Sequence, residues 1–134
     1  MRVRLIPDKG GDGTVHHIIV INDTGAARMS LRDTDLQHLG NRQGYTGWEG
    51  YTEVRNANGT RNRYRKLLLQ FQLVRGDDSP WSNWIEERAL IKPVIPGVPR
   101  LSGNKFRDVL YTGTAPGNHF LAVAATKGGM ASFL

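Results

Sequence analysis

The chain has 134 residues, which is long enough for one domain with its own hydrophobic core. Lys and Arg number 18 against 12 for Asp and Glu, so the net charge is +6 and acidic partners are favoured. The absence of cysteine excludes a disulfide scaffold and thiolate metal sites. No apolar run has the length of a signal peptide or a membrane span, so we expect a soluble protein, cytoplasmic or particle-associated.

Short β-type runs separated by 16 glycines predict a mostly-β domain. The first strand is expected over residues 2–6 and the second over residues 14–22. Four β-branched residues in succession, Ile18 to Ile21, predict that the second strand is buried. His16 and His17 are neighbours on this strand and point to opposite faces, so they cannot hold a metal together and are interpreted as structural.

The second predicted strand ends at an acidic turn, Asp23-Thr24-Gly25. A carboxylate after so apolar a strand is costly to bury, and a carboxyl with a displaced pKa is suited to acid–base catalysis. The Thr24 hydroxyl can fix the turn, and Gly25 permits backbone conformations that a side chain would forbid. The same residue types are common in ordinary turns, so a purely structural turn is the alternative.

Further along the chain, a short helix is expected in the stretch 29–40, where Asp33 or Thr34 can cap its start, Leu36 and Leu39 share one face and Gly40 can close its end. Two long β-type runs, residues 45–55 and 60–74, flank a hairpin signal at Asn56-Ala57-Asn58-Gly59. The root of this hairpin is apolar and its turn end is basic, which indicates a hairpin that projects from a core. The basic residues are Arg55, Arg61, Arg63, Arg65 and Lys66.

The simplest interpretation of these charges is a solvated strand edge that resists aggregation. The remaining elements are a strand over residues 81–91, a helix over residues 104–111 and a last strand over residues 118–125. A tail follows at about residues 126–134, where flexibility is expected.

In this order, the elements resemble the retropepsins, the single-domain aspartic proteases of retroviruses and long-terminal-repeat retroelements. The resemblance spans about residues 14–125. It rests on Asp23-Thr24-Gly25-Ala26 after an apolar strand, on the hairpin turn Ala57-Asn58-Gly59, and on Leu101-Ser102-Gly103 before a helix. It implies one mostly-β domain over residues 1–134 with a closed-barrel-like fold, a flap hairpin at about residues 51–68 and one or two short helices.

The activity implied by the resemblance is that of an aspartic endopeptidase without metal or cofactor. Such an enzyme needs two carboxyls that share one proton, and the chain has a single Asp-Thr-Gly turn. The implied assembly is therefore a homodimer with Asp23 from each subunit. Thr24 would brace the two turns, and Gly25 would offer a backbone acceptor to a peptide or retroelement-type polyprotein substrate.

Substrate contacts are further implied for Ala57, Asn58 and Gly59 of the flap. The other implied contacts come from Ala26, Ala27, Met29 and Val98. The resemblance also implies that terminal segments, residues 3–6 and 120–124, form the dimer strands.

Two alternatives to a peptidase remain, and the first of them rests on departures from the family pattern. Asn22 and Ser102 stand where aliphatic residues are usual, and Ala27 and Asn104 replace both partners of an acid–Arg pair found in many members. Asn22 supports the alternative of a degenerate member that binds peptides without cutting them. The other alternative is a basic β-barrel that binds nucleic acid through the hairpin's basic residues and Tyr64, although nucleic acid is not expected as the main ligand.

Overall fold

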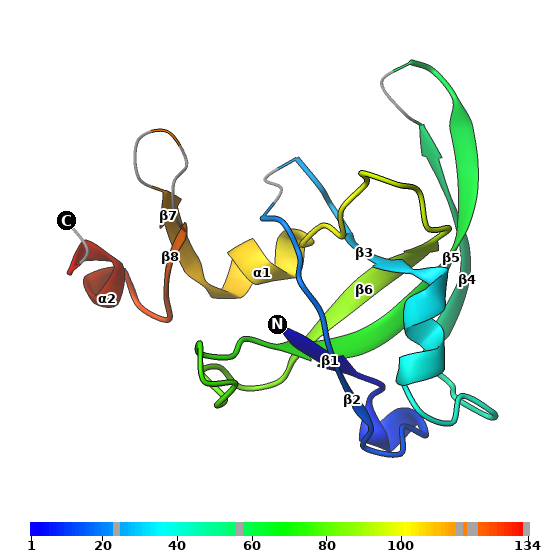
Figure 1. The fold of residues 1–134 in the computed structure, drawn as a ribbon, viewed down its shortest axis with the longest axis horizontal. Helices are drawn as coiled ribbons and strands as arrows, with labels where there is room; N and C mark the ends of the chain where they lie inside the picture. The colour runs from blue at the N-terminus through cyan, green and yellow to red at the C-terminus, as the bar shows by residue number, and fades with distance from the viewer. Residues whose placement is uncertain (23–24, 56–57, 115–116, 118–120, 133–134) are drawn as a thin grey trace.

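The computed structural model describes residues 1–22, 25–55, 58–114, 117 and 121–132. In this part of the chain, one six-stranded sheet forms the body and a separate two-stranded sheet lies beside it (Figure 1). The larger sheet contains β1 (Arg2–Arg4), β2 (Val15–His17), β3 (Met29–Arg32), β4 (Trp48–Arg55), β5 (Arg61–Gln72) and β6 (Ile85–Lys92). The smaller sheet contains β7 (Tyr111–Thr114) and β8 (Leu121–Ala124), and the helical segments are η1 (Pro7–Lys9), η2 (Asp33–His38), α1 (Asn104–Val109) and α2 (Lys127–Ala131).

The larger sheet is open. Its strand order is β2-β1-β5-β6-β3, with β4 paired to the distal half of β5. The pairs are antiparallel except for β3, which runs parallel to β6. Within the described residues the outer strands β2 and β3 are not paired with each other, so the expected closed barrel is wrong, whereas the mostly-β prediction is confirmed.

One face of the sheet carries the hydrophobic core, and we call it the core face. Alternate residues of β5 point to this face, and Leu67, Leu69 and Phe71 are at most 1% exposed. Helix α1 packs on the same face, where the Phe106 and Phe71 ring centroids are 6.4 Å apart. The other strands contribute Ala89 and Ile91 from β6, Met29 and Leu31 from β3, and Val3 from β1.

The predicted buried strand at residues 14–22 is shorter and more exposed than expected. Only Val15–His17 joins the sheet. Beyond it Ile18 is buried, but Ile19 is 85% exposed and Ile21 52% exposed. The chain leaves the sheet after β2, so the four β-branched residues do not all face the core. The prediction that this stretch is a buried strand is therefore wrong.

Two helix predictions are confirmed in position. The short helix expected to start at Asp33 or Thr34 is present as η2, a 3-10 helix, and residues 29–32 before it form β3 and pair with β6. The helix expected from residue 104 is confirmed as α1, although Tyr111 already belongs to β7. In the tail, expected to be flexible, α2 begins after Thr126, whose side chain accepts a hydrogen bond of 3.0 Å from Gly129 N.

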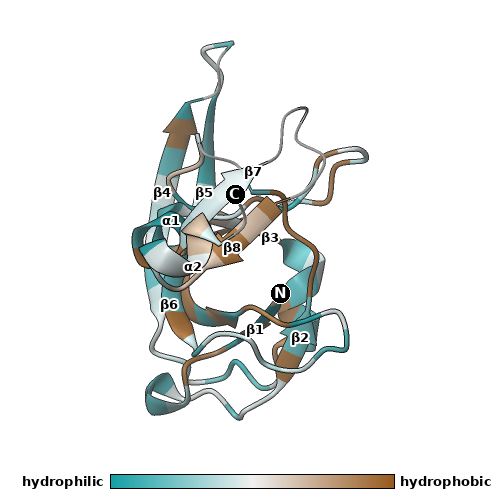
Figure 2. Cartoon of the chain, turned by 90° about the vertical axis from the view of Figure 1, so that its left-hand side faces the viewer, coloured by the Kyte–Doolittle hydropathy of each residue, from teal (hydrophilic) through white to brown (hydrophobic). Residues whose placement is uncertain are grey.

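The predicted hairpin is present and projects beyond the body of the molecule (Figure 1). Its strands pair from Tyr51 opposite Arg65 to Arg55 opposite Arg61. Figure 2 shows that the projecting part is mainly hydrophilic. Within the described residues, no helix is long and apolar enough to cross a membrane.

Candidate active site

The loop that carries the predicted catalytic turn connects Ile21 to β3. Asp23 and Thr24 lie outside the described residues. Gly25 and Ala27 are exposed, and Ala26 is half-buried. The position of this loop is therefore argued from the residues on either side of the acidic turn.

A second segment holds both ends of this loop, and we call residues 100–104 the bracing segment. On one side, Ile21 N donates to Arg100 O at 2.8 Å, and Ser102 N donates to Ile21 O at 2.9 Å. On the other side, Ser30 N donates to Leu101 O at 3.0 Å, and Leu101 N donates to the Ser30 hydroxyl at 2.8 Å. The bracing segment thus lies between the two chain stretches that enter and leave the acidic turn, and it fixes both.

A glycine in the bracing segment permits its close approach to β3. A Cβ atom at Gly103 would lie 2.5 Å from Met29 N and 2.6 Å from Glu87 Oε2, closer than real side-chain atoms come. Gly103 is therefore required by packing. Met29 itself is 1% exposed and belongs to the core, so its side chain does not reach the surface of the site as expected.

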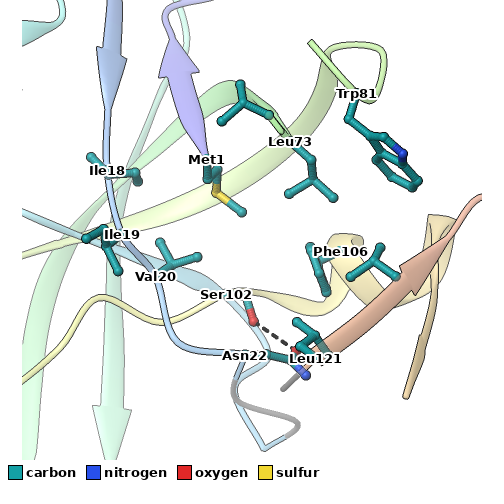
Figure 3. Close-up of a pocket in the computed structure, with 12 residues that line it drawn as sticks. Met1, Ile18, Ile19, Val20, Asn22, Leu73, Trp81, Ser102, Phe106 and Leu121 are labelled. Carbon is teal, nitrogen blue, oxygen red and sulfur yellow. Dashed lines mark hydrogen bonds between the residues drawn. The ribbon is translucent and has the colours of Figure 1, made fainter. Parts of the chain in front are cut away.

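The two unexpected polar residues of the site contact each other. Ser102 is 2% exposed, and its hydroxyl donates to Asn22 Oδ1 at 3.4 Å (Figure 3). Buried polar groups are costly unless they are hydrogen-bonded, so a polar residue at one position favours a polar residue at the other. Asn22 and Ser102 therefore form one polar contact in the packing beside the loop.

Helix α1 also holds the loop, through an arginine that sequence reasoning missed. Arg107 donates from one terminal nitrogen to Ala26 O at 2.7 Å and to Asn104 Oδ1 at 3.0 Å. Asn104 N donates in turn to Ala27 O at 3.2 Å. Arg107 follows Asn104 by three residues on a helix, a spacing at which side chains are neighbours and which could have signalled this pair. These contacts hold residues 26 and 27 of the loop against α1.

A buried carboxyl that no local sequence pattern indicates lies beneath the bracing segment. Glu87 is 8% exposed on the core face of β6. Its carboxylate accepts hydrogen bonds from Lys105 N at 2.9 Å and from Arg88 N at 2.8 Å. Burial raises the pKa of Glu87, and the two backbone donors oppose that shift. Glu87 therefore fixes the first turn of α1 against β6.

A second buried carboxyl anchors the start of the bracing segment. Asp35 is 2% exposed and accepts from Arg100 Nε at 2.8 Å and from a terminal Arg100 nitrogen at 2.7 Å. It also lies 3.0 Å from His16 Nε2 and accepts from Arg32 N at 2.8 Å. Burial raises the pKa of Asp35, but hydrogen bonds from Arg100, His16 and Arg32 N outweigh it and lower the pKa to about 2.

The histidines belong to this cluster. The His16 ring stacks on His38 with centroids 4.8 Å apart. His17 is exposed. Among the described residues, no group of three His, Asp or Glu side chains is placed to hold a metal ion.

The turn after β6 and the β4–β5 hairpin extend to the same side of the molecule as the segment between Ile21 and β3 (Figure 1). Val98 is 47% exposed in the turn after β6, and its carbonyl accepts from Arg32 at 3.3 Å. Asn58 and Gly59 are exposed at the hairpin tip, and Ala57 lies outside the described residues. The fold thus collects the loop, the Val98 turn and the hairpin at one end of the sheet.

An apolar pocket of about 330 Å³ lies beside the loop (Figure 3). Ile18, Phe106 and Leu121 contribute to its lining, and Asn22 and Ser102 form its polar wall. Among the described residues, β8 pairs only with β7 and leaves its other edge open beside this pocket.

One of the two segments expected to form dimer strands, residues 3–6, begins inside the larger sheet. Val3 lies in β1 and pairs with His16 on one side and with Phe71 on the other. Both edges of β1 are therefore occupied within one subunit. Of the two segments expected to form dimer strands, the one that contains β8 retains an open edge among the described residues.

Comparison of the chain with protein-family models, with curated proteins and with solved structures finds no match.

Proposed function

We propose that the chain is an aspartic endopeptidase of the retropepsin type, active as a homodimer. The observation that carries the proposal is the bracing segment, which holds both flanks of the Asp23-Thr24-Gly25 loop. Catalytic carboxyls must be held within fractions of an ångström of their working geometry, and a loop fixed at both ends by backbone hydrogen bonds meets that need. The contact from Arg107 to Ala26 O adds a third fixed point.

The proposed chemistry needs two carboxyls that share one proton. Two like charges a few ångströms apart cannot both ionise, so one Asp23 of the dimer is ionised and the other is protonated. The ionised carboxyl takes a proton from water as its oxygen attacks the peptide carbonyl carbon, and the protonated carboxyl donates to the carbonyl oxygen. Breakdown of the tetrahedral intermediate cleaves the C–N bond and returns a proton to the leaving amine. The two apparent pKa values belong to the pair.

Exposed apolar residues next to the loop support the dimer. Ile19 and Ile21 are 85% and 52% exposed, immediately before the acidic turn. Leu121 of β8 is 39% exposed and, like Ile19, lines the apolar pocket beside the loop. Apolar side chains gathered around a site are typical of a surface that another chain covers, and a second copy would bring the second Asp23.

The proposed substrate is an extended peptide, such as a segment of a retroelement-type polyprotein. It would lie between the loop and the β4–β5 hairpin, whose tip residues Asn58 and Gly59 would close over it. A hairpin that closes excludes water from the reacting bond. Ala26, Ala27 and Val98 would contact the substrate from the side of the body.

The contact between Asn22 and Ser102 weakens the case for a degenerate, non-cleaving protein. Asn22 was the main support for that alternative, because a polar residue before the catalytic acid disturbs apolar packing. In the structure Asn22 has a polar partner in Ser102. The unusual residue is thus accommodated by the site.

Hydrolysis of a mixed peptide library tests the proposal. The wild type is compared with Asp23→Asn at about pH 4 to 6.5, with and without a statine-type inhibitor. We expect cleavage that is lost in Asp23→Asn and blocked by the inhibitor. Silence from a wild type that is folded and dimeric, or full activity of Asp23→Asn, would overturn the proposal.

A further inference from the structure

Three arginines of β5 continue the core face onto the projecting hairpin. Arg61, Arg63 and Arg65 alternate along the strand in step with Leu67 and Leu69, so all five side chains point to one face. The two leucines are fully buried, whereas the three arginines are exposed. The face that forms the core inside the body therefore becomes a basic surface outside it.

The candidate active site lies on this same face of the sheet. Arg65 is directly opposite Ile91 on β6, and Ile91 is paired with Leu31 on β3. The bracing segment and α1 pack on the core face, as the contacts of Gly103 and Lys105 N with Glu87 show. An extended chain bound between the loop and the hairpin would therefore meet the arginines.

Aromatic residues of β4 hold two of these arginines in place. The guanidinium carbon of Arg65 is 3.6 Å from the Trp48 ring centroid, and that of Arg63 is 4.4 Å from the Tyr51 ring centroid. A guanidinium that stacks on a ring loses conformational freedom but keeps its in-plane N–H groups, which match the two oxygens of a carboxylate. Arg63 and Arg65 are thus prearranged to bind anions.

The charge of these arginines is poorly compensated by the chain itself. Glu53 is 3.9 Å from Arg61, and both side chains are 60% exposed, so this pair is weak. Glu53 is opposite Arg63 in the strand register, but within the described residues no carboxylate oxygen lies within 4.0 Å of a side-chain nitrogen of Arg63 or Arg65. Alternate residues of a strand are about 7 Å apart, which is also the spacing of alternate side chains in an extended peptide.

We propose that Arg61, Arg63 and Arg65 select peptides that carry Asp or Glu at alternating positions. This inference rests on the proposed function, since it assigns the substrate class of the same site. A single-stranded nucleic acid could use the same charges, but it binds by stacking its bases on open aromatic faces. The guanidinium groups of Arg63 and Arg65 cover the rings of Tyr51 and Trp48, so the arrangement favours a carboxylate-bearing peptide.

Binding to the inactive Asp23→Asn protein tests the inference separately from cleavage. The probes are two fluorescein-labelled ten-residue peptide pools of random background, one with Glu at every second position and one with Gln there. Fluorescence anisotropy at low salt should show the Glu pool bound roughly fivefold to tenfold more tightly. The preference should disappear when Arg63→Gln and Arg65→Gln are added, and it should remain with Lys66→Gln, which alters the opposite face of β5.

Equal affinity for the two pools would overturn the inference, and so would a preference that survives the loss of Arg63 and Arg65. Tighter binding of a single-stranded oligonucleotide than of the Glu pool, lost in the same double variant, would overturn it in favour of nucleic acid. Cleavage by the wild type without preference for the Glu pool leaves the proposed function standing and removes the inference. Preferential binding of the Glu pool without any cleavage by the wild type leaves the inference standing and removes the proposed function.

Discussion

Ser102 donates a hydrogen bond of 3.4 Å to Asn22 and so joins the bracing segment to the residue that precedes Asp23. The two residues are 80 positions apart in the chain. Together they form one polar contact in the wall of the apolar pocket. This contact makes the stability of the loop depend on both residues at once.

A double-mutant cycle should detect this coupling. We expect Asn22→Ala and Ser102→Ala each to lower the free energy of unfolding by about 1 kcal/mol, because each leaves a polar group without this partner. The double variant should lose about 0.5 kcal/mol less than the sum of the single losses. Urea unfolding measures all four proteins, and strictly additive losses would contradict the contact.

Removal of the Arg107 side-chain contact should impair catalysis more than folding. In Arg107→Met the Ala26 carbonyl loses its charged donor, and we expect kcat/KM to fall about tenfold because the loop is less well held. Peptide hydrolysis gives the rate, and thermal unfolding gives the stability. Lys105→Met removes an equal charge from the same helix and should change little. Equal losses in the two variants would show that Arg107 acts only through its charge.

Stability in acid should depend on Asp35. Its pKa is lowered to about 2 in the folded protein, so its contribution is present above the ordinary carboxyl pKa near 4 and is lost as the pH falls toward 2. A shift of this size corresponds to about 2 kcal/mol. In Asp35→Asn, unfolding followed between about pH 5 and 2 should lack this loss.

The same variant should be less stable at neutral pH by about 3 kcal/mol or more, because Arg100 is left without its carboxylate. Asp33→Asn, an exposed change on the same helical turn, should retain the acid-dependent loss. If Asp35→Asn retains the full acid dependence, the cluster around Asp35 does not control it.

Glu87 should produce the opposite pH dependence. Burial raises its pKa in the folded protein, so its contribution is greatest below the ordinary carboxyl pKa and is lost as the pH rises through the folded value. Glu87→Gln keeps an oxygen acceptor for Lys105 N and removes the charge. The melting temperature of this variant should fall less than that of the wild type between about pH 4 and 7. If the melting temperatures of the two proteins change equally with pH over this range, the raised pKa of Glu87 is contradicted.

Local patterns predicted the hairpin and α1 well. Asn-Gly at the turn and alternation along β5 locate the hairpin, because turn chemistry and strand period act over a few residues. Ile18 to Ile21 show the limit of this reasoning. β-branched residues indicate an extended chain, but whether each one is buried depends on the neighbours that the fold supplies, and β2 leaves the sheet at His17.

The spacing of Asn104 and Arg107 is a local signal, but the long-range supports of the site could not be read from local patterns. Arg107, Asp35 and Glu87 act through contacts with residues 18 to 81 positions away, and no short motif encodes such distances. The charged residues of the hairpin were visible in the sequence. Alternation along β5 puts Arg61, Arg63 and Arg65 on the face of Leu67 and Leu69, but only the pairing of β5 with β6 and the packing of α1 show that this face also carries the candidate site.

Mixing wild-type and Asp23→Asn subunits tests the central claim most directly. The two proteins are combined in equal amounts, allowed to exchange subunits, and assayed for peptide hydrolysis at a fixed total concentration. If each active site needs Asp23 from both subunits, the activity should be about one quarter of that of the pure wild type, because only about a quarter of the dimers pair two wild-type chains. An activity of about one half would contradict the account, since each wild-type chain would then act independently of its partner.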